Sequence, residues 1–194
     1  MRYLALLLIM LCACNAGPDP AVLRASLTAD SVAQIRVPVI FVQVPDRQLA
    51  ATLVPSGQNG PVRSWGSRDG VQLSYDLGVL VATRGLGHDL MAADVGGTLA
   101  ALRGAPMHYA RLLSTINGAY QTVIQRHDCV MTREGARLHE APLGPVHVTR
   151  YRESCNGARN YENIYHVAAD DTVWWSRQWV PNLGSAVETE RIKR

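Results

Sequence analysis

The chain has 194 residues, of which 47% are hydrophobic and 18% are charged, with a formal net charge of +3. This composition is typical of a folded globular protein and excludes a disordered one. Arginine supplies nearly all of the positive charge, and the arginines are scattered singly along the chain. Because no basic cluster forms, nucleic acid is not an expected partner.

The N-terminal segment MRYLALLLIMLCAC has one basic residue followed by an apolar run that is too short to span a bilayer. This pattern predicts a secretory signal over residues 1–13, which is removed and takes no part in the fold. Its end, Leu11-Cys12-Ala13-Cys14, resembles the lipobox of bacterial lipoproteins, so we expect Cys14 to carry lipid. The alternative is an ordinary secreted protein that is cleaved nearby, which would leave Cys14 as a stray thiol.

Lipidation at this cysteine would attach the protein to a membrane. A diacylglyceryl thioether with an N-acyl chain supplies the signals that stable attachment requires. By resemblance to other lipoproteins, Asn15 after the cysteine, rather than Asp, favours the outer membrane. We therefore expect a periplasm-facing lipoprotein, with residues 14–34 as a tether and short helix and residues 35–194 as a single β-rich domain.

One pair of cysteines remains once the signal is removed and Cys14 is lipidated. An oxidising periplasm favours a disulfide between these two residues, Cys129 and Cys155. The alternative is a metal site, because His127 and Cys129 would share one strand face, with His147 and Cys155 as further ligands. No CxxC or HxxxH spacing supports that site, so we expect neither a metal nor another cofactor.

The first part of the mature chain is expected to form strands after one short helix. Asp19 and Pro20 are placed as the cap and first turn of a helix that reaches about Leu27. The segments QIRVPVIFVQVP and ATLVP are rich in β-branched residues and contain prolines, as in edge or bulged strands. The segment VRSWGSRDGVQLSYDLGVLVATRG then predicts three strands, joined by an Asp69-Gly70 turn and a Leu77-Gly78 turn or bulge.

The second part begins with a Gly-rich, weakly helical segment that contains residues 106–115. Further strands are predicted over residues 119–132, 146–155, 161–168, 173–180 and 186–192. The turn residues that separate several of them are Glu134-Gly135, Asn156-Gly157 and Asp170-Asp171. Strands joined by short turns, with few helices, imply an antiparallel all-β meander that forms an open or partial barrel or sandwich.

The segment TRGLGHDLMAAD, residues 83–94, has two glycines and a His-Asp pair directly after an apolar run. It lacks the third glycine, the Lys-Ser/Thr pair and the βαβ frame of a phosphate-binding loop. The preferred interpretation is a turn with positive φ at the glycines, in which Asp89 caps residues 90–93. The alternative is a binding role for Arg84, Gly85, Gly87, His88 and Asp89.

Three tryptophans fall within six residues of the segment DTVWWSRQWVP. In a strand, Trp175, Arg177 and Trp179 share one face, and Trp174 lies on the other. The first three would form a ladder with the guanidinium over the indoles, which suits a sugar face or a protein interface. Core packing is favoured for Trp175 and Trp179, and surface contact for Trp174. All four residues are candidate contacts for a glycan or a partner.

Several segments resemble one family. The lipobox, the central WGSRDGVQLSYDLGVLVATRGLGHDL, and the later YENIYHV and VWWSRQWVPNLGSAVETERI are similar to the YjbF/GfcB family of outer-membrane lipoproteins. The resemblance covers roughly residues 35–192 and is most specific in Thr-Arg-Gly-Leu and Ser-Arg-Gln-Trp-Val. It implies a β-rich periplasmic domain encoded beside group 4 capsule or exopolysaccharide secretion components, with no established catalytic residues.

The expected function is therefore that of a lipid-anchored, non-enzymatic accessory protein of polysaccharide assembly or export. Its expected partners are the outer membrane, other polysaccharide-secretion proteins and, as a further candidate, the polysaccharide. One alternative is a carrier that holds a lipid or acyl chain in a hollow, apolar-lined concavity. Another is a hydrolase or lyase, which would need paired acids such as Asp89 and Asp94 converging in a cleft at about 5 to 10 Å.

Overall fold

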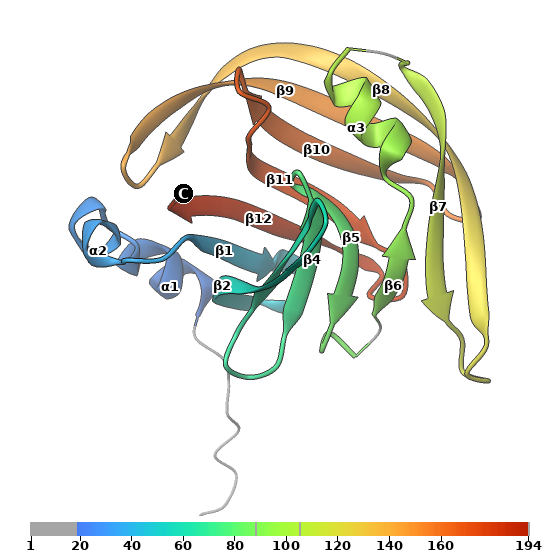
Figure 1. Ribbon diagram of the computed structural model, residues 1–194, viewed down its shortest axis with the longest axis horizontal. Helices are drawn as coiled ribbons and strands as arrows, with labels where there is room; N and C mark the ends of the chain where they lie inside the picture. Colours follow the sequence, from blue (N-terminus) through green and yellow to red (C-terminus); the bar gives the residue numbers. More distant parts are fainter. Residues whose placement is uncertain (1–18, 88, 105, 194) are drawn as a thin grey trace, which may run out of the picture.

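The structure is a computed structural model that describes residues 19–87, 89–104 and 106–193. These residues form one antiparallel sheet of twelve strands with three short α-helices (Figure 1). The all-β class predicted from the sequence is confirmed. The predicted signal segment, Cys14 and His88 lie outside the described residues.

Most of the elements along the described chain are strands, with few helices between them. The helices are α1 (Pro20–Ser26), α2 (Ala29–Gln34) and α3 (Gly96–Leu102), and a 3₁₀ turn covers Pro45–Arg47. The strands are β1 (Val39–Val44), β2 (Leu49–Asn59), β3 (Val62–Gly66), β4 (Gln72–Asp76), β5 (Val79–Arg84), β6 (Leu90–Ala93), β7 (His108–Ile116), β8 (Thr122–Ala141), β9 (Gly144–Gly157), β10 (Tyr161–Ala168), β11 (Val173–Val180) and β12 (Ser185–Lys193). In the described ranges, no helix has the length and apolar character needed to cross a membrane.

Two meanders make up the sheet, whose order is β5-β4-β3-β2-β1-β12-β11-β10-β9-β8-β7-β6. Strands that are neighbours in the chain pair with each other, except β5 and β6. In addition β1 pairs with β12, which joins the two meanders. The sheet curls until its two edge strands, β5 and β6, lie side by side (Figure 1). The expected open or partial barrel is thus a nearly closed one.

The seam between β5 and β6 is held by side chains. The backbone N–H of Leu90 on β6 donates to Thr83 Oγ1 on β5 at 2.9 Å. Arg84 Nη1 donates to the carbonyl of Leu90 at 3.3 Å. Unpaired strand edges are exposed to unwanted pairing, and these contacts cover the two edges of the sheet where they meet.

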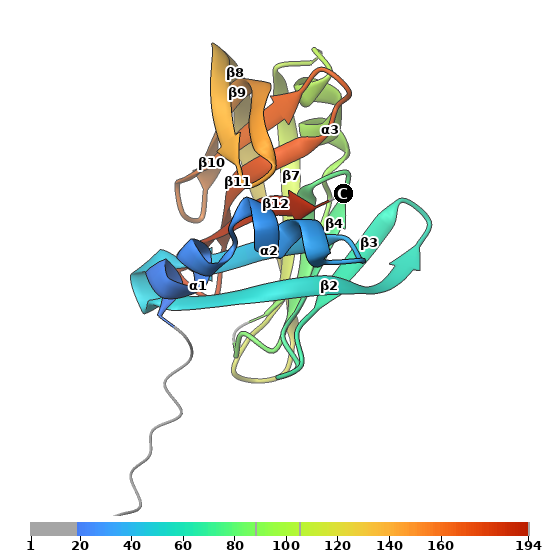
Figure 2. The ribbon, with the colours of Figure 1, turned by 90° about the vertical axis from the view of Figure 1, so that its left-hand side faces the viewer.

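The core lies inside the curl, because successive side chains of a strand point to opposite faces. Its buried members come from both meanders and include Ile40, Leu53, Trp65, Leu73, Leu113 and Val187. A second, smaller cluster lies on the outer face, where α1 and α2 cover β1 and β12 (Figure 2). There Leu27 and Val32 pack against Phe41 and Ile192.

One predicted element is wrong. The weakly helical segment expected over residues 106–115 is strand β7, and α3 is formed by the glycine-rich residues before it. Arg111, Leu113 and Thr115 are buried, while Leu112 between them is exposed. Because this alternation has the period of a strand, burial on the inner face of the sheet outweighs the helical tendency of the segment.

Two predicted turns lie inside strands. Glu134-Gly135 falls within β8, where the register with β9 shifts and Gly135 has a φ of 101°. A bulge at a glycine accommodates the extra residue, so β8 continues beyond it. Asn156-Gly157 is likewise the end of β9. Asp170-Asp171, in contrast, forms the predicted turn between β10 and β11.

Candidate functional site

A cleft of about 550 Å³ opens between the two meanders. One side comes from β1, β3 and β4, and the other from β11 and β12, with the β4–β5 and β10–β11 turns at the rim. The lining residues are Ile40, Gln58, Pro61, Arg63, Trp65, Tyr75, Leu77, Gly78, Arg103, Asp170, Asp171, Thr172, Val173, Trp174, Ser176, Thr189 and Arg191. The cleft therefore exists only where segments from the two ends of the domain meet.

Aromatic side chains form much of the inner lining. Trp65 on β3 and Tyr75 on β4 are buried, and Trp174 on β11 is half-buried. The hydroxyl of Tyr75 lies 2.6 Å from Thr189 Oγ1 on β12, which joins the two walls. Burial raises the pKa of Tyr75 well above its ordinary value, so the phenol stays neutral.

Charged side chains stand at the mouth. Arg103 at the end of α3 and Asp171 form an ion pair at 3.5 Å. Arg63 on β3 is exposed, and no described residue gives its guanidinium a hydrogen bond or an ion pair. The half-buried Arg191 adds a third arginine from β12. The cleft thus combines an aromatic interior with three arginines and two aspartates, Asp170 and Asp171.

The β4–β5 turn is packed tightly against β11. A Cβ built on Gly78 would lie 2.5 Å from Val173 Cβ, so only glycine fits at this position. The preceding residue, Leu77, also has a positive φ of 45° and is exposed at the cleft. The turn predicted at Leu77-Gly78 is present, and it sets the distance between two walls of the cleft.

A buried polar network lies directly beneath the cleft. Gln178 Nε2 donates to Ser176 Oγ at 2.9 Å and to the carbonyl of Gly78 at 2.9 Å. Gln178 Oε1 accepts from the N–H of Leu80 at 2.8 Å, and Arg111 Nη2 donates to the Leu80 carbonyl at 3.4 Å. Buried backbone groups need partners. These side chains supply them along the edge of β5 that pairs with no strand through backbone hydrogen bonds.

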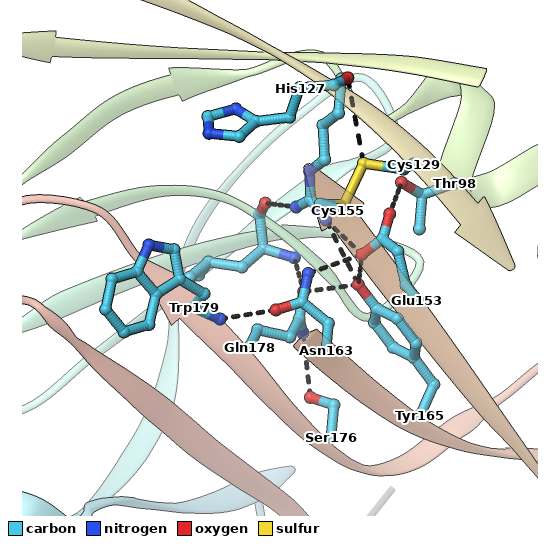
Figure 3. Close-up of polar contacts among 12 residues, drawn as sticks. Thr98, His127, Cys129, Glu153, Cys155, Asn163, Tyr165, Ser176, Gln178 and Trp179 are labelled. Atoms are coloured by element: carbon cyan, nitrogen blue, oxygen red, sulfur yellow. Dashed lines mark hydrogen bonds and ion pairs between the residues drawn. A yellow bond between two sulfur atoms is a disulfide. The ribbon is translucent and has the colours of Figure 1, made fainter. Parts of the chain in front are cut away.

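Glu153 on β9 is the centre of this network, as Figure 3 shows. Its two oxygens accept hydrogen bonds from Thr98 Oγ1 (2.7 Å), Tyr109 OH (2.7 Å), Arg111 Nη1 (2.7 Å), Asn163 Nδ2 (2.5 Å) and Tyr165 OH (2.9 Å). Burial alone would raise the pKa of Glu153, but the charge of Arg111 and these hydrogen bonds hold it below its ordinary value. The carboxylate therefore stays ionised, and both of its oxygens already accept hydrogen bonds.

The predicted disulfide between Cys129 and Cys155 is confirmed. The two residues face each other across β8 and β9, and their sulfurs are 2.03 Å apart (Figure 3). Bonded sulfurs cannot act as thiolate ligands, which removes two members of the alternative metal site. A third member, His127, is buried and packs edge to face on Tyr161, with ring centroids 5.0 Å apart.

The tryptophan strand divides between two faces of the sheet. Trp174 lines the cleft, whereas Trp175 contacts His166 at a ring-centroid distance of 4.9 Å. The guanidinium over the Trp179 ring, at 5.0 Å, is that of Arg159. Arg177, which the sequence places in the ladder, instead has its Nε 3.7 Å from Glu188 Oε1.

Sequence reasoning missed Arg63, Trp65 and Tyr75 as companions of Trp174. In β4 the buried Leu73 and Tyr75 alternate with half-buried residues, which marks Tyr75 as inward-facing, and in β3 Trp65 shares a strand face with Arg63. No local signal indicates which strand lies opposite them, because β3 and β11 are separated in the chain and in the sheet order.

The TRGLGHD segment connects β5 to β6. The Asp89 carboxylate accepts hydrogen bonds from Thr83 Oγ1 (2.8 Å), Gly85 N (3.0 Å) and Leu86 N (3.2 Å). Gly85 and Gly87 have φ values of 81° and 83°. Asp89 thus ties the turn that precedes it. Residues 90–93, which it was expected to cap, form strand β6.

The fold and the cleft define a disulfide-linked antiparallel β-domain that is nearly closed, with a filled interior and an open aromatic cleft. Residues 21–192 match the family described as "Group 4 capsule polysaccharide lipoprotein gfcB, YjbF". The chain therefore belongs to this family of capsule-polysaccharide-associated lipoproteins, as its sequence resemblance indicates.

A solved structure shares the fold. The hypothetical lipoprotein YmcC from Escherichia coli K12 has a TM-score of 0.76 and 15% identity, and the similarity covers 90% of this chain and 93% of that one. A protein from Bacteroides fragilis, described as exported and YmcC-like in fold, has a TM-score of 0.34 and 10% identity over 80% and 93% of the two chains. That score is too low to support an argument. No curated protein matches the chain in sequence.

Proposed function

We propose that this protein is a lipid-anchored, non-enzymatic accessory protein of capsule or exopolysaccharide assembly or secretion at the outer membrane. The observation that carries the proposal is the family match over residues 21–192, whose description names both a capsule polysaccharide and a lipoprotein. Lipid on Cys14 attaches the chain to the membrane, and Asn15 after it favours the outer membrane. The β-domain then faces the periplasm.

A binding role is favoured because the carboxylates of Glu153, Asp89 and Asp94 already accept hydrogen bonds within the protein. Glu153 is fully buried, and its oxygens accept five hydrogen bonds, so it has no access to a substrate. The carboxylate of Asp89 is committed to the β5–β6 turn. Asp94 Oδ1 accepts from the N–H of Gly96 at 3.1 Å. Neither Asp89 nor Asp94 lines the cleft.

The carrier alternative is disfavoured by what fills the interior. A carrier of acyl chains needs a hollow lined by apolar groups, whereas Arg111, Glu153 and Gln178 occupy the inside of this sheet. The cleft itself is lined by three arginines and two aspartates beside its aromatic residues. Burying such charges against an acyl chain is costly. This lining supports a polar ligand or a protein partner.

The proposed partners are the outer membrane, through the lipid on Cys14, other polysaccharide-secretion proteins, and the polysaccharide itself. An accessory protein of this kind acts by contact, so its cleft and its outer faces are the surfaces available to partners. Nucleic acid is not proposed, because the arginines form no continuous basic face in the sequence.

Deletion of the gene, with complementation, tests the proposed function. Loss of the protein should lower the amount of polysaccharide at the cell surface, and the wild-type gene should restore it. Cys14→Ala protein should remain in the periplasm and restore the polymer less well, since it lacks the residue that would carry the lipid. Cys12→Ala is the matched control, because it keeps the lipidated cysteine. Unchanged surface polymer in the deletion strain would refute the proposed function.

A further inference from the structure

We infer that the cleft binds a short segment of an acidic polysaccharide. One sugar ring would lie against Trp174, and an acidic group of the polymer would pair with Arg63. The inference rests on the proposed function, since that function brings the polymer to the protein. It goes further by assigning a site within the fold and a chemical class of sugar.

The dimensions and lining of the cleft suit a small stretch of sugar. Its volume of about 550 Å³ lies within the roughly 300 to 1,000 Å³ that is common for ligand sites. Trp65, Tyr75 and Trp174 reach it from three different strands. An aromatic side chain with a polar atom offers a flat apolar face and a hydrogen-bonding edge. A pyranose ring presents the same two features, a face of C–H groups and an edge of hydroxyls.

The distribution of charge favours an anionic ligand. The lining carries three arginines and two aspartates, and the ion pair between Arg103 and Asp171 neutralises one of each. Arg63, on the β3 side, is exposed and has no ion-pair or hydrogen-bond partner in the described part of the chain. A guanidinium binds a carboxylate or phosphate through two parallel hydrogen bonds. Arg63 is therefore placed to receive an acidic group of the sugar chain.

The walls of the cleft are held in place before any ligand arrives. Tyr75 is hydrogen-bonded to Thr189 across the walls, and Gln178 fixes the carbonyl of Gly78 from below. The close approach of Gly78 to Val173 prevents the β4–β5 turn from moving toward β11. A site that is already ordered loses less entropy on binding. A weakly held, flexible oligosaccharide benefits most from such a site.

Calorimetric titration of the mature lipoprotein tests this inference. The protein is purified in a detergent that has no sugar headgroup and is titrated with tri-galacturonate or with maltotriose. The two trisaccharides are alike in length, but only the first is acidic. We expect tri-galacturonate to bind at least about tenfold more tightly, as one charge-assisted contact would produce.

Variants locate the binding. Arg63→Gln should weaken the binding of tri-galacturonate by about tenfold and leave the weak binding of maltotriose unchanged. Arg68→Gln is the matched control, because Arg68 is also an exposed arginine, in the β3–β4 turn, but does not line the cleft. Trp174→Leu should weaken the binding of both trisaccharides. Arg63 and Arg68 are both exposed, so Arg63→Gln and Arg68→Gln should fold normally.

Three outcomes would overturn the inference: no binding of tri-galacturonate, equal affinity for the two trisaccharides, or affinity that survives Arg63→Gln. Displacement of bound tri-galacturonate by a fluorescent fatty acid would assign the cleft to an acyl chain instead. Failure of the inference is distinguishable from failure of the proposed function. Absent binding of tri-galacturonate by the wild-type protein, while the deletion strain still loses surface polymer, refutes only the inference. Binding that depends on Arg63, together with unchanged polymer in the deletion strain, refutes only the proposed function.

Discussion

Arg111 Nη1 lies 2.7 Å from Glu153 Oε2, and both side chains are buried inside the curled sheet. The two residues belong to β7 and β9, which are separated in the sheet by β8. Arg111 also donates to Leu80 on β5, across the seam. Arg111 therefore links β7 both to β9 and to the edge strand β5, and its ion pair with Glu153 fills space that a carrier protein would leave hollow.

Glu153→Gln should destabilise the protein by about 3–5 kcal/mol, because it leaves the buried charge of Arg111 without a counter-charge. The free energy of unfolding, measured by denaturant titration, checks this prediction. Glu140→Gln is the control, since Glu140 is exposed near the end of β8 and should change stability by less than about 0.5 kcal/mol. Similar small effects of both substitutions would contradict the role assigned to the ion pair.

The same carboxylate predicts a dependence of stability on pH. The pKa of Glu153 is lower in the folded protein than its ordinary value, so the folded state holds its proton less tightly than the unfolded state. Its stabilising contribution is complete above the unfolded pKa of roughly 4.3 and is lost as the pH falls through the folded pKa. The difference in unfolding free energy between wild type and Glu153→Gln should therefore shrink on acidification below about pH 4.

His166 predicts a second, separate pH effect. Burial, followed by the charges of His139 and Arg150, lowers its pKa to about 4. Between that value and the unfolded pKa of about 6.5, only the unfolded state takes up the proton, so stability falls as the pH drops through this window. His166→Gln should remove part of the loss in unfolding free energy between about pH 7 and pH 5. His108→Gln, at an exposed position on β7, should not.

Removal of the disulfide by Cys129→Ala with Cys155→Ala should lower the free energy of unfolding by about 3–4 kcal/mol, from the chain entropy of the loop that it closes. The two cysteines are 26 residues apart in sequence. Reducing agent should destabilise the wild type by a similar amount and leave the double variant unchanged. Two alkylatable thiols in unreduced, denatured protein from the periplasm would contradict the bond in the cell.

Two glycines of the β5–β6 turn offer a matched comparison. Gly85 and Gly87 have nearly the same positive φ, but a Cβ on Gly85 would lie 2.7 Å from the Gly70 carbonyl oxygen, whereas a Cβ on Gly87 has open space. Gly85→Ala should cost about 1–3 kcal/mol more than Gly87→Ala in unfolding free energy. Equal costs would show that backbone conformation alone matters at this turn.

The neighbouring His88 lies outside the described residues, so its predicted minor role stays a prediction. His88→Ala should leave both the melting temperature and the surface polysaccharide close to wild type. A folded His88→Ala protein that fails to support export would contradict the interpretation of the segment as a turn and would favour a binding site there.

The sequence by itself determined the β class, the cysteine pair and several strands. The strands predicted over residues 161–168 and 173–180 coincide with β10 and β11. Each of these features depends on local composition or on counting, such as β-branched runs, turn residues and an even number of cysteines. The family resemblance is likewise a property of the residues in order, and it is confirmed over residues 21–192.

Only the tertiary structure decided where the site lies. Arg63 and Trp174 belong to opposite halves of the chain, and the curl of the sheet brings them to one cleft. The strand character of β7 also depends on the fold, because Arg111 is stable inside only when Glu153 is there to receive it. Local sequence patterns indicate which face of a strand is buried, but the pairing of distant strands decides which side chains that face contacts.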